Sequence, residues 1–207
     1  IGCLILKFEG LEEKIEADGV GSLAGQSGFQ VIGSALTRSR GMEYGEIVSM
    51  PETERAIRTA LQSAQKLANS RVDHVIACIS GGSPRSYGLE GTVDIKTGIV
   101  DDNDIADVLG SCGIPAYGSD REVLHAQPVN FSLDHRTGLS DPRGQIGKKL
   151  SVDMHMLTVK EKTIHDLAYC LKRCDLELAG VASASYASAL SSLVEDEKEL
   201  GAACIDL

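Results

Sequence analysis

The chain has 207 residues, of which 43% are hydrophobic and 24% charged, and its formal net charge at pH 7 is −10. This composition is that of an ordinary globular protein, and it excludes disordered and fibrous classes. The acidic balance disfavours a nucleic-acid-binding surface, which needs a basic patch. No apolar run of the sequence approaches the roughly 18 residues that a membrane-spanning helix requires.

The N-terminal part of the chain is predicted to contain two strands and one helix. Residues 1–9 and 29–37 have the pattern of strands, and 38–45 form a turn-rich connection. A helix is predicted over 51–69, where the apolar residues keep helical spacing. Ser49 and Glu52 predict a capping box at its start.

Residues 72–142 are predicted to form a compact inserted unit with the order strand, strand, helix, strand. The strands are expected over 72–80, 87–95 and 121–134, and the helix begins near Asp101. Asp101, Asp102 and Asp104 place negative charge beside the unsatisfied N–H groups of a helix start, so their plainest role is a solvated cap. Because acid is unusually dense here, the alternative is a docking surface for a basic peptide.

The C-terminal part alternates strands and helices, which indicates an α/β fold with a partly parallel sheet. A strand is predicted from 148 to 156, a helix that Thr158 and Glu161 would cap, a strand over 176–182, a helix over 183–194 and a last strand over 202–207. Asp206 would stand at the tip of this last strand, where nucleotide-binding folds place a carboxylate that faces phosphate or metal. The plainer interpretation of Asp206 is a carboxylate that caps a turn. Because both ends fall inside predicted strands, we expect the chain to be a piece of a larger protein.

Several weaker patterns favour structural roles over chemistry. The segment 19–24 matches G-x-G-x-x-A but lacks the preceding strand and following helix of a dinucleotide site, and Gly81-Gly82-Ser83 lacks the lysine of a phosphate loop. The six cysteines are scattered as small buried side chains are in a reducing compartment, which predicts a cytoplasmic protein. Cys170 and Cys174 lie on one predicted helix without a second pair at zinc-site spacing. We identify no catalytic residue and no metal ligand.

Four ordered segments carry a resemblance to a known family. They are Ser39-Arg40-Gly41-Met42-Glu43-Tyr44-Gly45-Glu46-Ile47, Val123-Leu124-His125, Gly138-Leu139-Ser140-Asp141-Pro142-Arg143-Gly144, and Glu195-Asp196-Glu197-Lys198-Glu199-Leu200-Gly201 leading to Cys204-Ile205-Asp206. Together they resemble the FtsA family of bacterial cell-division proteins, within the actin-like ATPase superfamily. The resemblance extends from about residue 29 to residue 207, and residues 1–9 fit a strand of the family's first subdomain.

The resemblance implies an actin-like (ribonuclease H-like) α/β fold in two parts. Residues 1–71 and 143–207 would be an incomplete subdomain 1A, residues 72–142 the inserted strand-strand-helix-strand subdomain 1C, and the second lobe would be absent. Intact members bind ATP with Mg²⁺ between two lobes, with Asp206 on the nucleotide side. ATP and Mg²⁺ are therefore expected in the intact protein, with at most weak ATPase activity, and no cofactor and no activity are expected in these 207 residues alone.

The resemblance also implies a set of partners. FtsZ would bind the missing second lobe, and the membrane would be reached through a missing C-terminal amphipathic helix. The inserted subdomain would serve self-association into filaments and would recruit later division proteins, including the basic cytoplasmic tail of FtsN, with Asp101, Asp102 and Asp104 as the docking residues. The expected location is the cytoplasmic face of the inner membrane at the division septum. The alternatives are a pilus-assembly actin-like protein that binds a short peptide, and an actin-fold enzyme such as a sugar kinase or ATPase.

Overall fold

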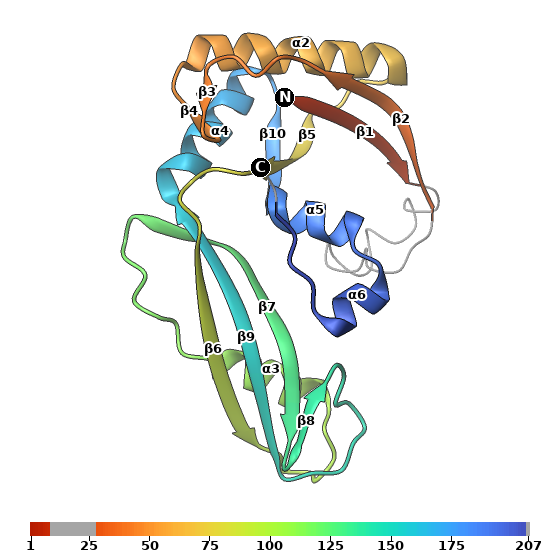
Figure 1. Cartoon of the computed structure of the whole chain (residues 1–207), viewed down its shortest axis with the longest axis vertical. Helices are drawn as coiled ribbons and strands as arrows, with labels where there is room; N and C mark the ends of the chain where they lie inside the picture. The colour runs from red at the N-terminus through yellow and green to blue at the C-terminus, as the bar shows by residue number, and fades with distance from the viewer. Residues whose placement is uncertain (9–27, 206–207) are drawn as a thin grey trace. The chain divides into compact units, whose positions relative to one another are not determined.

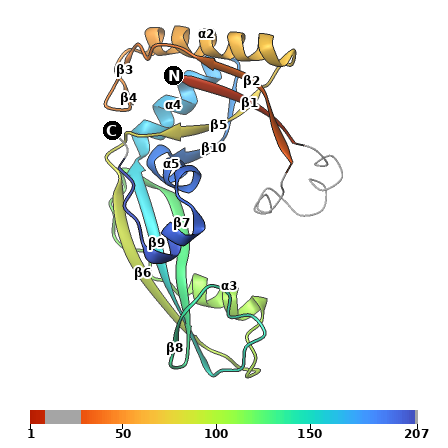
Figure 2. The ribbon, with the colours of Figure 1, turned by 45° about the vertical axis from the view of Figure 1, so that its right-hand side comes forward.

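The structure is a computed structural model that describes residues 1–8 and 28–205, and its ribbon is drawn in Figures 1 and 2. Strands and helices are mixed along the chain, as the sequence predicts. The chain divides into two compact units, 1–76 with 166–180 and 77–165 with 181–207.

The first unit packs a long helix on a pair of antiparallel strands. Helix α2 (Met50–Ala68) lies against β2 (Phe29–Leu36), which pairs with β1 (Gly2–Phe8). Gly33 of β2 comes so close to α2 that a Cβ atom there would collide with the carbonyl oxygen of Ala64. The apolar core of this unit consists of Ile57, Leu61, Cys170, Leu171, Cys174 and Leu176. The helical spacing of apolar residues therefore predicted most of the buried face of α2, but Leu67 near its end is 67% exposed.

The connection between β2 and α2 contains a small hairpin, formed by β3 (Met42–Glu43) and β4 (Glu46–Ile47). Its two turn residues, Tyr44 and Gly45, have φ angles of 52° and 74°. Positive φ at both central residues is the geometry that matches the twist of a two-residue hairpin. The predicted turn-rich connection thus has a defined structure.

Helix α2 begins without the capping box that the sequence predicts. Ser49 is the N-cap residue and is extended, but its side chain makes no capping hydrogen bond. Instead the buried hydroxyl of Thr53 lies 3.0 Å from the carbonyl oxygen of Ser49 and 2.9 Å from that of Gly41. The capping-box prediction was wrong because the helix start is held by the preceding chain.

The second unit is built on a four-stranded sheet in the order β6-β9-β7-β8. The strands are β6 (Arg85–Asp94), β7 (Arg121–Leu133), β8 (Arg136–Leu139) and β9 (Lys149–Lys160), and every neighbouring pair is antiparallel. Strand β9 lies between β6 and β7, although the predicted inserted unit ended at residue 142, before this strand. Alternation along a strand shows which face is buried and does not show which strands are its partners.

Helix α3 (Asp102–Gly110) covers one face of this sheet. It can lie close because β6 has Gly91, where a Cβ atom would be 2.5 Å from the carbonyl oxygen of Val108. The core between helix and sheet consists of Ile95, Val100, Ile105, Val108, Phe131, Leu133, Leu150 and Val152. The second unit therefore has an apolar core of its own.

The remaining elements connect or follow these layers. Helix α4 (Glu161–Arg173) follows β9, and β10 (Glu177–Ser183) pairs with β5 (His74–Ile79). Helices α5 (Ala184–Ser192) and α6 (Glu195–Leu200) are the last helices of the described residues. Residues 202–205 are exposed and form no strand, so the predicted last strand was wrong over these positions. Among the helices of the described residues, none is long and apolar enough to cross a membrane.

Candidate partner-binding site

The predicted acidic cluster lies at the first turn of α3, and two of its carboxylates cap the helix. Asp101 is the N-cap residue, and its Oδ1 accepts hydrogen bonds from the backbone N–H groups of Asn103 (2.8 Å) and Asp104 (3.0 Å). The Oδ2 of Asp104 accepts from the N–H of Asp101 at 3.0 Å, which closes a capping box. The hydrogen bond from the Asp104 N–H is the main cause that lowers the pKa of Asp101. The predicted helix cap is confirmed.

The third carboxylate, Asp102, points to a segment far away in the sequence. Its Oδ1 lies 2.7 Å from Nε of Arg143, and Nη1 of Arg143 lies 3.0 Å from Oδ2 of Asp141. The hydrogen bond to Asp102 is the main cause that raises the pKa of Arg143. Because the Asp102 side chain is 87% exposed and solvent screens the pair, the ion pair contributes little to stability and leaves this carboxylate accessible.

Backbone hydrogen bonds hold the two segments together. Val100 donates to the carbonyl of Gln145 (3.0 Å), and Gly144 donates to the carbonyl of Val100 (2.9 Å), while Pro142 is fully buried. We call the resulting surface the acidic tip, defined by Asp101, Asp102, Asp104, Asp141 and Arg143. It contains four carboxylates and one guanidinium, so a cationic segment would be attracted to it.

Two other sequence motifs lie outside the described residues. They are Asp206, which the sequence predicted on the nucleotide side, and the glycine-rich segment 19–24. Their roles stay predictions.

The segment Gly81-Gly82-Ser83 is a turn whose carbonyl groups are bound by the protein itself. Gly82 has φ +88°, and its carbonyl accepts from the N–H of Lys160 at 2.8 Å. The carbonyl of Ser83 accepts from Nη2 of Arg121 at 2.7 Å. This arrangement supports the predicted strand-ending turn.

Arg121 is a buried cation that the sequence did not indicate. It is only 7% exposed, and besides Ser83 it binds the hydroxyl and the carbonyl oxygen of Thr158, both at 2.9 Å. Thr158 therefore belongs to β9 and does not cap α4, so the second predicted capping box was wrong. An arginine at a predicted strand end gives no signal of burial, because most such residues are solvated.

One group of side chains in the described part of the chain has the composition of a metal site. The His165 Nε2 lies 3.5 Å from the Glu122 Oε1 and 3.7 Å from the Glu161 Oε1. These residues could hold a divalent ion. The same geometry is that of an ordinary surface cluster of an imidazole and two partly exposed carboxylates, so we assign no metal to it.

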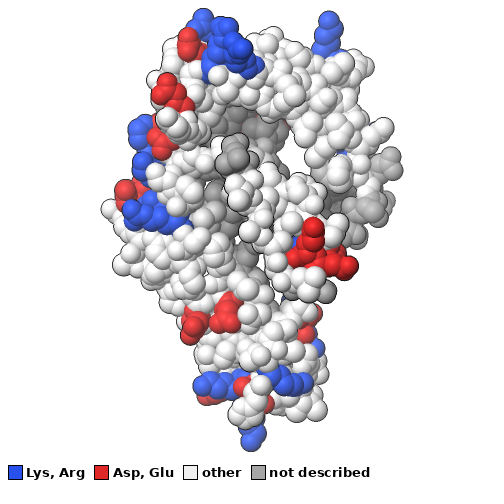
Figure 3. Space-filling model, in the orientation of Figure 1, with Lys and Arg blue, Asp and Glu red and all other residues white. Residues whose placement is uncertain are grey.

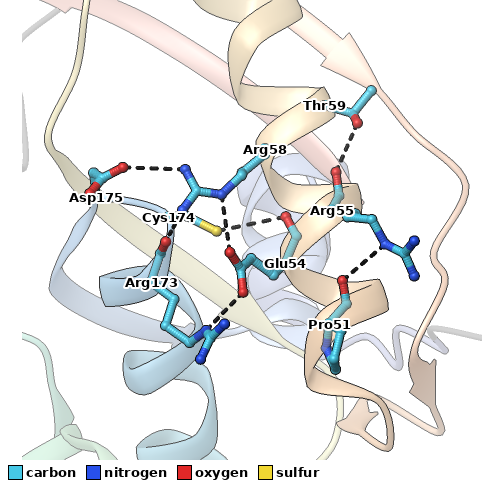
Figure 4. Close-up of polar contacts among 8 residues, drawn as sticks. All are labelled: Pro51, Glu54, Arg55, Arg58, Thr59, Arg173, Cys174 and Asp175. Atoms are coloured by element: carbon cyan, nitrogen blue, oxygen red, sulfur yellow. Dashed lines mark hydrogen bonds and ion pairs between the residues drawn. The ribbon is translucent and has the colours of Figure 1, made fainter.

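Cys170 and Cys174 pack in the core of the first unit, as the sequence predicts. Beside them an ion-pair network joins α2 to the end of α4 (Figure 4). Glu54 binds Nε of Arg58 (3.2 Å) and Nε of Arg173 (2.8 Å), and Arg58 binds Asp175 at 3.2 Å. The hydrogen bond from the Arg173 side chain is the main cause that lowers the pKa of Glu54.

The buried thiols are expected to resist alkylation in the folded chain. Burial is the main cause that raises the pKa of Cys170 to about 11, so its thiolate is scarce at neutral pH. Cys78 and Cys204 are exposed. With iodoacetamide at pH 8 and peptide mapping, we expect Cys78 and Cys204 to be labelled first and Cys170 only after unfolding. Equal labelling rates in the folded chain would contradict the buried position.

The pKa values of two histidines are expected to shift in opposite directions from the ordinary value. His125 accepts a hydrogen bond from the N–H of Ser183 (2.9 Å), and burial lowers its pKa, while the hydrogen bond to Asp73 raises the pKa of His74. Below about pH 6.5, the unfolded chain binds more protons at His125 than the folded chain does. The neutral His125 therefore contributes to the free energy of unfolding above that pH, and this contribution is lost as the pH falls through the lowered pKa of the folded chain. An NMR titration should give a pKa below about 6.5 for His125 and a pKa above about 6.5 for His74. The reverse order would contradict both assignments.

Comparison with known proteins places these features in a family. Residues 81–158 match the model of the SHS2 domain inserted in FtsA, and this range covers β6, α3, β7, β8 and most of β9. The chain is 36% identical over 179 residues to the cell division protein FtsA of Rhizobium meliloti (strain 1021), a match that covers 86% of the chain and 40% of that relative. The chain thus contains a match to the SHS2 domain of FtsA and is similar to FtsA proteins over most of its length. The FtsA proteins of Pseudomonas aeruginosa PAO1 and Escherichia coli K12 are 31% and 25% identical over 188 residues, 91% of the chain.

The chain spans less than half the length of these relatives, between 40% and 45%. Among solved structures, it is similar to a chain of the PilM-PilN type IV pilus biogenesis complex, with a TM-score of 0.51, 10% identity and 78% of the chain covered. At this identity the likeness concerns the fold alone, and it supports the actin-like fold class that the resemblance implies. The acidic tip lies within the matched SHS2 domain.

Proposed function

We propose that the chain is part of an actin-like cell-division scaffold and that it contacts other division proteins through its SHS2 unit, which comprises residues 81–158. The observation that supports this most is the position of the acidic tip, which lies inside the domain that characterises the FtsA relatives. Its carboxylates lie at a capped helix start and beside a turn that backbone hydrogen bonds hold. In this proposal, Asp101, Asp102 and Asp104 bind a basic segment, such as the cytoplasmic tail of an FtsN-type protein.

Further parts of the proposal concern the intact protein. It would bind ATP and Mg²⁺ with Asp206 near the nucleotide, polymerise, and tether FtsZ to the membrane at the septum through parts beyond these residues. The inserted subdomain 1C would correspond to about 81–158, since β9 pairs within that sheet, and the flanking residues to subdomain 1A. The pilus-assembly alternative has weaker support, because the PilM likeness extends only to the fold.

The test is the affinity of the 207-residue chain for a fluorescent basic peptide of the FtsN type. Replacing Asp101, Asp102 and Asp104 together with asparagine removes three charges, while asparagine at the N-cap keeps its capping ability. We expect binding to weaken about tenfold and to fall with added salt.

The matched control changes three other exposed acidic residues of the second compact unit, outside residues 81–158. Glu195, Asp196 and Glu197 of α6 are exposed, and their neutral amide variants change the net charge equally. This control should leave the affinity unchanged. Equal weakening in both variants, or none in the first, would exclude the acidic tip as the docking site.

A further inference from the structure

A basic pocket lies in the first unit. It has a volume of about 410 Å³ and is formed by the chain after β2 and one face of α2. Glu52, Arg55 and Thr59 share this face because residues three and four apart are neighbours on a helix. The chain after β2 contributes Thr37, Arg38 and Arg40.

Within the described part of the chain, the three guanidinium groups of this pocket have no carboxylate partner. Arg55 donates from Nε to the carbonyl of Pro51 (3.2 Å), and no carboxylate of the described residues lies within ion-pair distance of Arg38, Arg40 or Arg55. This is unusual in a chain with 30 acidic and 20 basic residues. Figure 4 shows Arg55 pointing away from the neighbouring network, in which Arg58 is paired with acids. Lys and Arg side chains also gather over the N-terminal half of α2 in Figure 3.

The chemistry of the pocket favours an oxyanion. A guanidinium presents N–H donors in a planar fork that fits two oxygens of a phosphate group, so several forks around one cavity are suited to phosphate. The side chain of Thr37 adds a hydroxyl group, and that of Thr59, which donates to the carbonyl of Arg55 (2.8 Å), keeps its acceptor capacity. Ala56 is the one apolar side chain among the lining residues, so the pocket offers no wall for a nucleobase.

The geometry points to a binding site for a small phosphate group, in which Arg38, Arg40 and Arg55 hold the anion. The phosphate can belong to a free ion or to the headgroup of a phospholipid, since both present the same oxygens. Glu52 is the one acidic residue in the lining, and it opposes an anion. The site goes beyond the proposed division function, because it lies in the other unit and shares no residue with the acidic tip.

The experiment titrates the chain with inorganic phosphate in a chloride buffer and follows backbone amide signals of 37–40 and 52–59 by NMR. We expect saturable shifts, about tenfold weaker binding for each of Arg38→Gln, Arg40→Gln and Arg55→Gln, and tighter binding for Glu52→Gln. Arg85→Gln is the matched control, because Arg85 is an exposed cation in the other unit. It should bind phosphate as the unchanged chain does.

A second arm uses phosphatidylcholine vesicles with and without phosphatidylglycerol. Saturable binding of free phosphate assigns the site to a soluble anion, and binding to phosphatidylglycerol vesicles alone, lost in Arg40→Gln, assigns it to a lipid headgroup. The proposal is overturned if neither probe binds, or if Arg85→Gln weakens binding as much as the pocket variants do. The basic peptide should bind Arg40→Gln normally, so failure here leaves the proposed function standing.

Discussion

Replacing Gly41 with alanine is expected to destabilise the chain by about 3 kcal/mol, one of the two largest losses that we predict for a single substitution. Gly41 has φ +77°, a conformation that costs a non-glycine residue about 1–2 kcal/mol. An added Cβ would also lie 2.5 Å from the carbonyl oxygen of Ser49 and 2.7 Å from the backbone nitrogen of Thr53. Moving this backbone costs roughly 1–3 kcal/mol more. The measurement is the free energy of unfolding in urea.

The matched control for this prediction is Gly98→Ala. Gly98 has almost the same φ, +78°, but a Cβ there would meet nothing within 4 Å. Its replacement should cost only about 1 kcal/mol, the conformational part alone. Equal losses at the two glycines would show that the close contact around Gly41 does not exist.

Replacing Arg121 with methionine is expected to cost about 3 kcal/mol. Methionine keeps much of the side-chain volume and removes the donors to the carbonyl oxygens of Ser83 and Thr158 and to the Thr158 hydroxyl. Each buried acceptor left without a donor costs roughly 1–3 kcal/mol, partly offset because a charge no longer has to be buried. The unfolding free energy again provides the measurement.

Arg85→Met is the comparison for Arg121, because Arg85 belongs to the same sheet and is exposed. A surface change of this kind alters stability by less than about 0.5 kcal/mol. If Arg121→Met were as mild as Arg85→Met, the buried arginine would not hold the turn at Ser83 to β9.

Local sequence patterns predicted most helices and strands. The features that these patterns did not predict depend on contacts between segments that are distant in the sequence. Helical spacing located α2, and alternation located β9, because both depend on neighbours in the sequence. The central position of β9 and the burial of Arg121 depend on contacts between distant segments. Both predicted capping boxes failed where contacts with other segments hold the chain: Thr53 binds the carbonyl of Gly41 at the start of α2, and Thr158 lies in β9 and binds Arg121.

The candidate site shows the same division between local and distant information. The acid at the start of α3 was predicted as a helix cap, since a cap requires only the next three residues. The contact between Asp102 and Arg143 joins residues 41 positions apart, and no spacing in the sequence indicates it. The sequence likewise gave no indication of the pocket, because Arg38 and Arg40 follow β2 and line one cavity with residues of α2 only through the tertiary fold.

The most direct test of the central claim, that the SHS2 unit is the partner-binding part of the chain, is NMR mapping of the basic peptide on the 207-residue chain. We expect saturable amide shifts at 100–104 and 141–145, around the acidic tip. We also expect these shifts to weaken when Asp101, Asp102 and Asp104 are changed to asparagine. Saturable shifts confined to 29–76, or peptide binding that leaves residues 81–158 unchanged, would contradict it.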